Sequence, residues 1–290
     1  MADDPLPAFT GARLDRADHL RADPDALAGM MTWRARLLRL DGLLPDVAPD
    51  GMLGWGTLAD APEDAELVFL GLLDEKPCFA AVPDRGDAGP RMANPALWAM
   101  MEALLPDQLS LYAGARSLVD WHARHRHCAQ CGGTTRIAKG GWQRNCETCG
   151  AQHFPRTDPV AIALVENDGQ LLLGRGLGWP EGRYSALAGF VEPGESIEEA
   201  VAREILEETG IAVRKVRYVA SQPWPFPSQL MIGCYAVSDT QAITLDETEL
   251  ADARWFTREE VERSMAGDGP FGPPPPQAIA HTLVRWWLDR

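Results

Sequence analysis

The sequence predicts an α+β protein built from three successive parts. Residues 1–125 mix short apolar runs that suit strands with longer stretches that suit helices. Residues 126–155 carry two Cys-x-x-Cys pairs, and residues 156–290 alternate strand-like runs with a helix rich in glutamate. We therefore expect an N-terminal α+β domain, a small cysteine module and a C-terminal domain, which a chain of 290 residues can accommodate.

The N-terminal domain offers structure but no evident chemistry. Residues 1–50 are rich in Asp, Arg and Leu without a clear period. Residues 66–82 form two apolar runs around an Asp-Glu-Lys-Pro turn and predict a β-hairpin. Residues 94–125 predict helix that is interrupted near Pro106, because proline removes a backbone donor and clashes with the preceding turn.

The cysteine module has the spacing of a zinc ribbon. Two C-x2-C pairs separated by 14 residues let two tight turns place four thiolates tetrahedrally around one Zn²⁺. Four protein ligands leave no open position, so the zinc is expected to be structural; a redox site would need only one such pair. His122, His125 and His127 just upstream are expected to be solvated residues at a helix end. The four expected ligands are Cys128, Cys131, Cys146 and Cys149.

The C-terminal domain begins with a strong hairpin pattern. Residues 158–176 are two β-rich runs joined by Asn-Asp-Gly, a turn that matches strand twist. Residues 196–209 predict a helix that Gly210 ends, because glycine adopts the left-handed C-cap conformation freely. The remaining expected elements are strands at 213–220, 231–237 and 251–256, a stiff four-proline linker at 273–276 and an amphipathic helix in 277–290.

The predicted helix gathers more negative charge than a helix tolerates without help. Apolar residues recur at i, i+4 and i+8, which leaves Glu204, Glu207 and Glu208 together on another face. Like charges at this spacing each destabilise a helix by roughly 0.2–0.5 kcal/mol. One interpretation is a solvated acidic face. The other is a site for hard divalent cations, where oxygen ligands favour Mg²⁺ or Mn²⁺ over zinc.

Composition narrows the classes of function. Hydrophobic residues make up 46% and charged residues 24%, a globular profile, and no apolar run approaches the ~20 residues that span a bilayer. The N-terminus is acidic without an apolar core of a signal peptide, so we expect a cytoplasmic protein. A net charge of −15 argues against sequence-independent coating of nucleic acid but not against a nucleotide substrate.

The acidic helix lies inside a longer pattern. Gly189, five residues, Glu195, seven residues and then REILEETGI fit G-x5-E-x7-R-E-U-x-E-E-x-G-U, where U is aliphatic. This stretch resembles a Nudix box, and the chain is similar to the Nudix hydrolases. The resemblance implies an α/β/α sandwich in which divalent cations activate water to cleave a diphosphate linked to a nucleoside.

The resemblance also assigns roles by position. Glu204 and Glu208 are the implied main metal ligands, and Glu207 is a third ligand or the catalytic base. Arg203 is expected to orient the glutamates through ion pairs. The further implied ligands of Mg²⁺ or Mn²⁺ are the carbonyl of Ala188 and the distal Glu249.

The segment SQPWPFPSQLM, residues 221–231, carries information about the substrate. Its prolines hold two aromatic side chains at fixed angles, which suits stacking on planar rings or capping of the core. It resembles the S-Q-P-W-P-F-P-x-S signature of NADH pyrophosphatases, a family that also has a zinc ribbon before the Nudix domain and a separate N-terminal domain. The closing serine of the signature falls on Gln229 here, and Ser228 lies one place earlier.

The family pattern implies a substrate pocket and an assembly. Phe154 and Phe190 are expected to sandwich a base, and family members are typically homodimers with sites near the interface. The other implied substrate contacts are Gln222, Trp224, Phe226, Ser228, Gln229, Met231 and Ala280.

The expected function is metal-dependent hydrolysis of NADH to reduced nicotinamide mononucleotide and AMP, with NAD⁺ as a slower substrate. The resemblance also allows removal of NAD caps from RNA 5′ ends. The alternatives are a Nudix hydrolase of ADP-ribose or diadenosine polyphosphates, and a nucleotide sensor or zinc-ribbon nucleic-acid-binding protein without catalysis.

Overall fold

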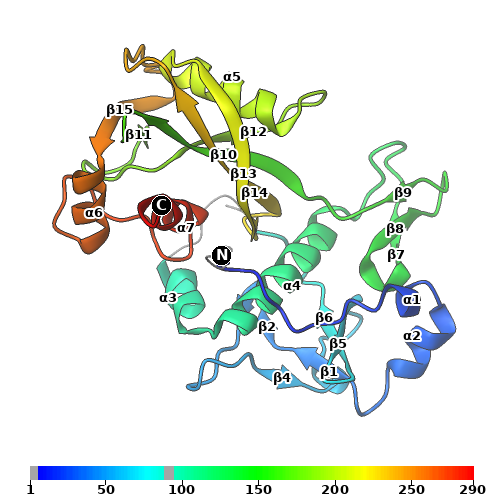
Figure 1. Ribbon diagram of the computed structural model, residues 1–290. Coiled ribbons are helices and arrows are strands. Elements are labelled where there is room, and N and C mark those ends of the chain that lie inside the picture. Colours follow the sequence, from blue (N-terminus) through cyan, green and yellow to red (C-terminus); the bar gives the residue numbers. More distant parts are fainter. Residues whose placement is uncertain (1–5, 88–94) are drawn as a thin grey trace. The chain divides into compact units, whose positions relative to one another are not determined.

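The computed structural model describes residues 6–87 and 95–290 and divides the chain into two compact units (Figure 1). The N-terminal unit comprises Phe9–Thr157 together with Pro223–Ser228. The C-terminal unit comprises Asp158–Gln222 and Gln229–Arg290, together with the described residues 6–8. No helix in the described part of the chain is both long enough and apolar enough to cross a bilayer.

The C-terminal unit is built on one mixed sheet. Its strand order is β13-β14-β10-β11-β15, and β12 pairs with β10. The central strand β10 runs parallel to β14 and antiparallel to β11 and β12. The elements are β10 (Asp158–Asn167), β11 (Gln170–Gly176), β12 (Leu187–Phe190), α5 (Ile197–Thr209), β13 (Val213–Trp224), β14 (Gln229–Ser238), β15 (Leu250–Thr257), α6 (Arg258–Ala266) and α7 (Ile279–Leu288).

The two faces of this sheet carry separate apolar cores because strand side chains alternate. Along β10, Ala161 and Val165 point into a cluster that includes Val201 and Ile205 of α5. The intervening Leu164 points into a second cluster with residues of α6 and α7. Helices α5 and α7 accordingly lie on opposite sides of the sheet in Figure 1. The predicted α/β/α sandwich is confirmed.

The ends of α5 follow from local sequence, as predicted. Ser196 accepts a hydrogen bond from the backbone N–H of Glu199, and the Glu199 side chain returns one to the N–H of Ser196. This reciprocal capping box satisfies two of the free donors at the start of the helix. Gly210 ends the helix with φ 69°, a left-handed conformation that costs glycine little.

The predicted hairpin at 158–176 is confirmed as β10–β11, and the three later strands are present as β13, β14 and β15. Two details differ from expectation. Residues 221–224, expected in a loop, extend β13; Pro223 is tolerated there because β13 is an edge strand. Helix α6 was not predicted, although Thr257 and Glu260 form its capping box.

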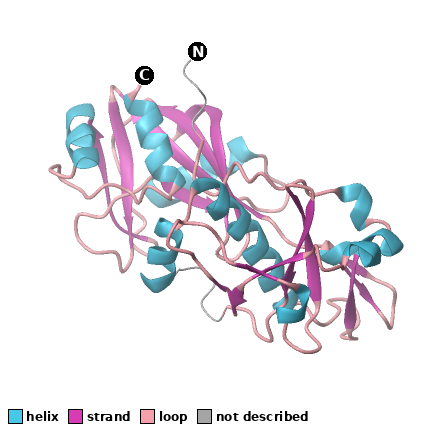
Figure 2. Ribbon diagram, turned by 90° about the horizontal axis from the view of Figure 1, so that it is seen from below, coloured by secondary structure: helices cyan, strands magenta, loops and turns pink. Residues whose placement is uncertain are grey.

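The N-terminal unit also contains both strands and helices. Figure 2 colours the helices of the chain cyan and its strands magenta. Its main sheet has the order β4-β1-β6-β5, and the predicted hairpin is confirmed as β5–β6. The predicted helix is broken before Pro106, which is the first residue of the second helix.

Its elements are short except for one helix. They are α1 (Asp18–Arg21), α2 (Pro24–Met30), β1 (Arg36–Leu38), β2 (Leu40–Asp41), β3 (Leu44–Pro45), β4 (Trp55–Gly56), the 3-10 turn Leu58–Asp60, β5 (Leu67–Leu73), β6 (Lys76–Ala81), α3 (Pro95–Ala103), α4 (Pro106–Arg124), β7 (Thr135–Ala138), the 3-10 turn Lys139–Gly141, β8 (Gln143–Cys146) and β9 (Gln152–His153).

One expectation about this unit is wrong. His122 is not solvated but fully buried: Nε2 lies 2.6 Å from the carbonyl oxygen of Gly141, and Nδ1 lies 3.0 Å from Arg144 Nη1. Arg144 in turn forms a two-pronged ion pair with Glu66. A sequence pattern could not reveal this, because the partners lie 19 to 78 residues apart in the chain. Burial lowers the pKa of His122 to about 4.

Candidate functional site

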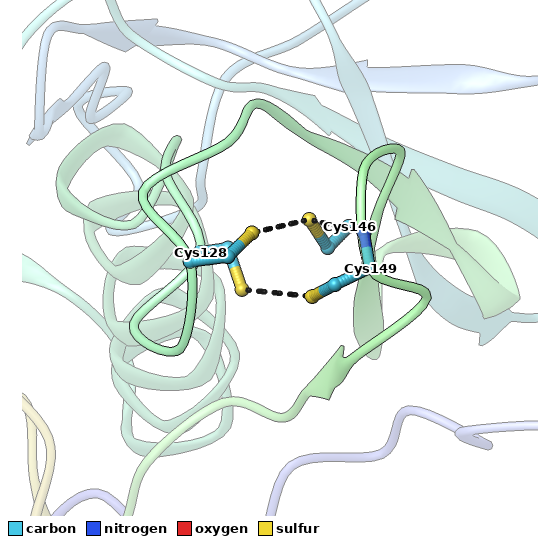
Figure 3. Close-up of side chains that lie close together, drawn as sticks. Cys128, Cys146 and Cys149 are labelled. Atoms are coloured by element: carbon cyan, nitrogen blue, oxygen red, sulfur yellow. Dashed lines mark hydrogen bonds between the residues drawn. The ribbon is translucent and has the colours of Figure 1, made fainter.

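The cysteine module forms a metal site. The side chains of Cys128, Cys146 and Cys149 converge from two loops in Figure 3, and the ligand atoms of all four cysteines lie within 4.8 Å of one another. The Sγ atoms of Cys128 and Cys149 are 3.7 Å apart, and those of Cys131 and Cys146 are 3.5 Å apart. Tetrahedral zinc with Zn–S bonds of ~2.3 Å places sulfurs about 3.8 Å apart, so the four thiols fit structural zinc.

Backbone donors prepare this module for metal. The N–H groups of Cys149 and Thr148 point at the Sγ atom of Cys146 and lower the pKa of that thiol to about 6. Nε2 of His153 lies 3.2 Å from the Sγ atom of Cys128. The two backbone donors favour the thiolate of Cys146, which is the form that binds metal. The expected structural zinc site is therefore supported by the chemistry of its donors.

Arg203 organises the acidic face of α5. Its guanidinium pairs with both oxygens of Glu195 at 2.6 and 2.9 Å, and Nη1 donates to Glu204 at 2.8 Å and to Glu207 at 3.0 Å. Nη2 also donates to the carbonyl oxygen of Phe190. The expected ion pairs between Arg203 and the glutamates are thus confirmed. The same guanidinium lowers the pKa of Glu195 to about 2.

The first residue of the Nudix box, Gly189, must lack a side chain for a steric reason. A Cβ atom added to Gly189 would lie 1.9 Å from the carboxyl carbon of Glu204, so any side chain would displace that carboxylate. Gly189 lies in β12, opposite Ala161 of β10. The absence of a side chain therefore lets α5 bring Glu204 directly against the sheet.

Glu208 is the most unusual carboxylate of the unit. Its side chain is 7% exposed, and its Oε2 atom has no hydrogen-bond partner in the described structure. Burial, and after it the negative charges of Glu204, Glu249 and Asp246, together raise its pKa to about 8. A carboxyl group in such a place either keeps its proton or, when ionised, requires a cation beside it.

Asp246 is an acidic neighbour that sequence reasoning missed. Its backbone N–H donates to the carbonyl oxygen of Glu208 at 3.0 Å, and its carboxylate accepts hydrogen bonds from Thr248. It precedes Glu249 in the acidic run DETE, residues 246–249. That run was the available signal, but only the fold shows that it lies beside α5.

The acidic residues fit a divalent cation in chemistry. Within residues 6–87 and 95–290, the four cysteines are the one group of three or more ligand side chains gathered within 4.8 Å. The glutamates lie farther apart because Arg203 draws Glu204 and Glu207 toward itself. The buried, unpartnered oxygen of Glu208 and its acidic neighbours are the features that a cation would satisfy. The assignment of its ligands stays a prediction: they are the carbonyl of Ala188 and the side chains of Glu204, Glu207, Glu208 and Glu249.

The nine expected substrate contacts differ in accessibility. Phe154 and Phe190 are 57% and 44% exposed and belong to different units. Gln222 is fully buried, and its amide donates to the carbonyls of Ala8 and Gln277 and accepts from the N–H of Ile279. Phe226 and Ala280 are buried, and Trp224, Ser228, Gln229 and Met231 are half-buried. Their assignment to substrate stays a prediction.

Comparison with known proteins identifies the family. The model of the NADH pyrophosphatase-like rudimentary NUDIX domain matches residues 33–121, that of the NADH pyrophosphatase zinc ribbon domain matches 123–154, and that of the NUDIX domain matches 155–273. NAD-capped RNA hydrolase NudC of Mycobacterium bovis is 41% identical over 274 residues, which cover 90% of this chain and 86% of that protein. The chain belongs to the NADH pyrophosphatase family of Nudix hydrolases. Human NAD-capped RNA hydrolase NUDT12 is 39% identical over 265 residues, 87% of this chain but 54% of its own length, so the chain spans about half of that relative.

Membership of the Nudix family explains why carboxylates gather on one face of α5. A diphosphate carries dense negative charge, and water is a poor nucleophile at neutral pH. Cations held by carboxylates neutralise phosphate oxygens and activate water. In this chain the carboxylates lie on α5, the backbone of β12 approaches Glu204 closely, and Arg203 forms hydrogen bonds with Glu204 and with the carbonyl oxygen of Phe190.

Proposed function

We propose that this chain hydrolyses the pyrophosphate bond of NADH, and more slowly that of NAD⁺, to a nicotinamide mononucleotide and AMP. The observation that carries the proposal is Glu208, a buried carboxylate with an unpartnered oxygen among further acids inside a complete Nudix box. The zinc ribbon and the rudimentary NUDIX domain of NADH pyrophosphatases support the substrate.

In this proposal the glutamates hold Mg²⁺ or Mn²⁺, which supplies charge neutralisation and water activation. Before a cation binds, Arg203 pairs with the carboxylates of Glu204 and Glu207, and we do not assign it a contact with substrate. Glu207 is exposed, and either it or Glu208 accepts the proton from the attacking water. The water attacks one phosphorus, and the other phosphate leaves with its nucleoside.

The exposed rings are proposed as base contacts. Phe190 is the last residue of β12 and the second residue of the box. Its carbonyl oxygen accepts a hydrogen bond from Arg203, which holds its backbone near the glutamates. Phe154 is proposed as the second ring of a sandwich. Gln229, Ser228 and Met231 at the start of β14 are proposed to contact the rest of the dinucleotide.

The wider context is proposed from the family. Relatives named as NAD-capped RNA hydrolases support the NAD-capped 5′ end of RNA as a second substrate, with recognition centred on the cap because the chain carries a net charge of −15. We also propose a cytoplasmic homodimer. Sedimentation equilibrium would test the assembly: a single species at 31.7 kDa would contradict the dimer.

Product analysis tests the activity. The purified protein is incubated with NADH, NAD⁺, ADP-ribose and NAD-capped RNA, with Mg²⁺, with Mn²⁺ and with a chelator. We expect release of nicotinamide mononucleotide and AMP from NADH, dependent on metal. Faster cleavage of ADP-ribose than of NADH would indicate a different Nudix substrate. Binding of NADH without turnover under all metal conditions would indicate a nucleotide sensor.

A further inference from the structure

The segment Pro223–Ser228, which comprises the last two residues of β13 and the loop that leads to β14, belongs to the N-terminal unit. These residues pack into the same compact unit as Phe9–Thr157, whereas most of β13 and all of β14 belong to the C-terminal unit. They include the signature residues Trp224 and Phe226. The rudimentary NUDIX domain therefore contacts the part of the chain that distinguishes this family from other Nudix hydrolases.

Arg116 of α4 makes the polar part of this contact. Its side chain is 1% exposed, and Nη1 donates to the carbonyl oxygen of Pro225 at 2.6 Å. Nη2 pairs with the carboxylate of Asp87, whose backbone N–H donates to Asp120. The guanidinium carbon also lies 4.6 Å from the centre of the Phe226 ring. One buried cation thus holds both the backbone and an aromatic face of the segment.

Aromatic side chains complete the contact around Trp224. Its ring centre lies 5.6 Å from that of Phe9, 6.0 Å from that of Trp98 and 5.4 Å from that of Phe226. With Arg116 over Phe226, both signature rings are packed against protein. They are therefore built as anchors of the segment rather than as open surfaces for a base.

The chemistry of Arg116 points to positioning rather than to stability. Removing a guanidinium from water is costly, and an apolar residue of similar volume stabilises a core at least as well as a buried ion pair. The Nε atom of Arg116 is also buried without a partner in the described structure, which adds to that cost. A buried guanidinium contributes geometric specificity, because its directional hydrogen bonds fix the position of the carbonyl group that accepts them.

We propose that Arg116 is a positioning residue for the substrate, through which the rudimentary NUDIX domain sets the conformation of Pro223–Ser228. By holding Pro225 and Phe226, it fixes the origin of β14, where Ser228 and Gln229 present polar groups. This inference rests on the proposed function only in naming the substrate as a dinucleotide. The role of the N-terminal domain follows: it shapes the recognition segment from outside the Nudix domain.

The test compares three variants. Arg116→Met keeps the length of the side chain and removes its donors, and Arg116→Lys keeps the charge and one direction of donation. Arg124→Met is the matched control, because Arg124 lies on the same helix and forms an ion pair with Asp120, but within the described residues it forms no ion pair with the segment. Circular dichroism and thermal unfolding establish that each variant is folded.

For Arg116→Met we expect KM for NADH to rise about tenfold while kcat stays within twofold of wild type. The KM of Arg116→Lys should lie between those of Arg116→Met and wild type, and the KM of Arg124→Met should equal that of wild type. The Mn²⁺ concentration for half-maximal rate should not change, because the hydrogen bond and ion pair of Arg116 go to Pro225 and Asp87. Amide hydrogen exchange should speed up in residues 223–229 for Arg116→Met and not for Arg124→Met.

Two results would overturn the proposal. One is unchanged KM and unchanged exchange in Arg116→Met. The other is a parallel loss of kcat and stability in Arg116→Met that Arg124→Met shares, which would indicate only a structural role. If the wild-type protein cleaves another diphosphate instead of NADH, the same KM comparison is made with that substrate, so failure of the NADH assignment is distinguished from failure of the positioning role.

Discussion

Replacement of Glu208 by glutamine should weaken the enzyme and, in the absence of divalent cations, relieve a pH-dependent instability. Glu208 is buried among Glu204, Glu249 and Asp246, and its pKa is raised to about 8 from an ordinary value near 4.5. Between these two pH values the folded protein binds the proton more tightly than the unfolded chain. The free energy of unfolding therefore falls as pH rises through that window, and below it Glu208 contributes no further change.

The magnitude follows from the shift. Each unit of pKa corresponds to about 1.4 kcal/mol, and partial solvent screening reduces the full shift, so ionising Glu208 should cost the metal-free fold about 2–4 kcal/mol by pH 8. Glutamine does not ionise, so the Glu208→Gln variant does not carry this pH-dependent cost in the free energy of unfolding. A buried amide without a partner carries its own cost of ~1–3 kcal/mol, but that cost does not depend on pH.

The assay is the difference in unfolding free energy between Glu208→Gln and wild type, from denaturant titrations at pH 5 to 8. Chelating resin removes free divalent cations from the buffer and leaves the structural zinc in place. We expect the free energy of unfolding of the variant to increase relative to that of wild type as pH rises. Added Mn²⁺ should stabilise wild type at pH 8 and leave the variant almost unchanged, and NADH turnover by the variant should fall at least 100-fold. A difference that stays flat with pH would refute the reasoning.

Three other perturbations test separate parts of the structure. Gly189→Ala should lower kcat at least tenfold with little loss of stability, because the new Cβ would displace the carboxylate of Glu204; steady-state kinetics and thermal unfolding check both halves. Cys131→Ser should lose one equivalent of zinc by atomic absorption and lower the unfolding temperature, because the closed site loses a thiolate. For His122 the folded pKa of about 4 lies below the ordinary 6.5, so the unfolded chain binds the proton first and stability should fall as pH drops from 6.5 to 4. His122→Gln should flatten that part of the acid-unfolding curve.

The parts of the fold that sequence predicted are those with local causes. Ser196 and Glu199 cap α5, and Gly210 ends it in a conformation open to glycine. Pro106 opens a new helix because it cannot continue the previous one. The Nudix box is a contiguous pattern, and the ion pairs of Arg203 lie within it. The helix ends and these ion pairs depend on residues no more than eight positions apart, and the box is one uninterrupted stretch of sequence.

The parts that sequence did not predict depend on distant partners. His122 is buried because Gly141, Arg144 and Glu66 close around it. Asp246 lies beside Glu208 only because the chain returns to α5 after β14. Arg116 meets Pro225 across 109 residues of sequence. No periodicity or motif carries such information, since it arises from the packing of the finished fold.

The same distinction applies within the signature segment. The pattern S-Q-P-W-P-F-P predicted the family, which the comparisons confirm. It gave no indication that Gln222 would be saturated by hydrogen bonds or that Phe226 would be buried. A signature records which residues a family keeps, and the fold decides whether they touch a ligand or hold the residues that do.

The central claim is that the carboxylates of α5 exist to bind divalent cations against a diphosphate. Crystals soaked with Mn²⁺ and a non-hydrolysable dinucleotide analogue test it most directly through the anomalous signal of the metal. We predict Mn²⁺ peaks ~2.0–2.3 Å from oxygens of Glu204 and Glu208, with Glu204 turned away from Arg203. An anomalous map without such peaks, in crystals where the analogue is bound and Glu204 is still paired with Arg203, would contradict the claim.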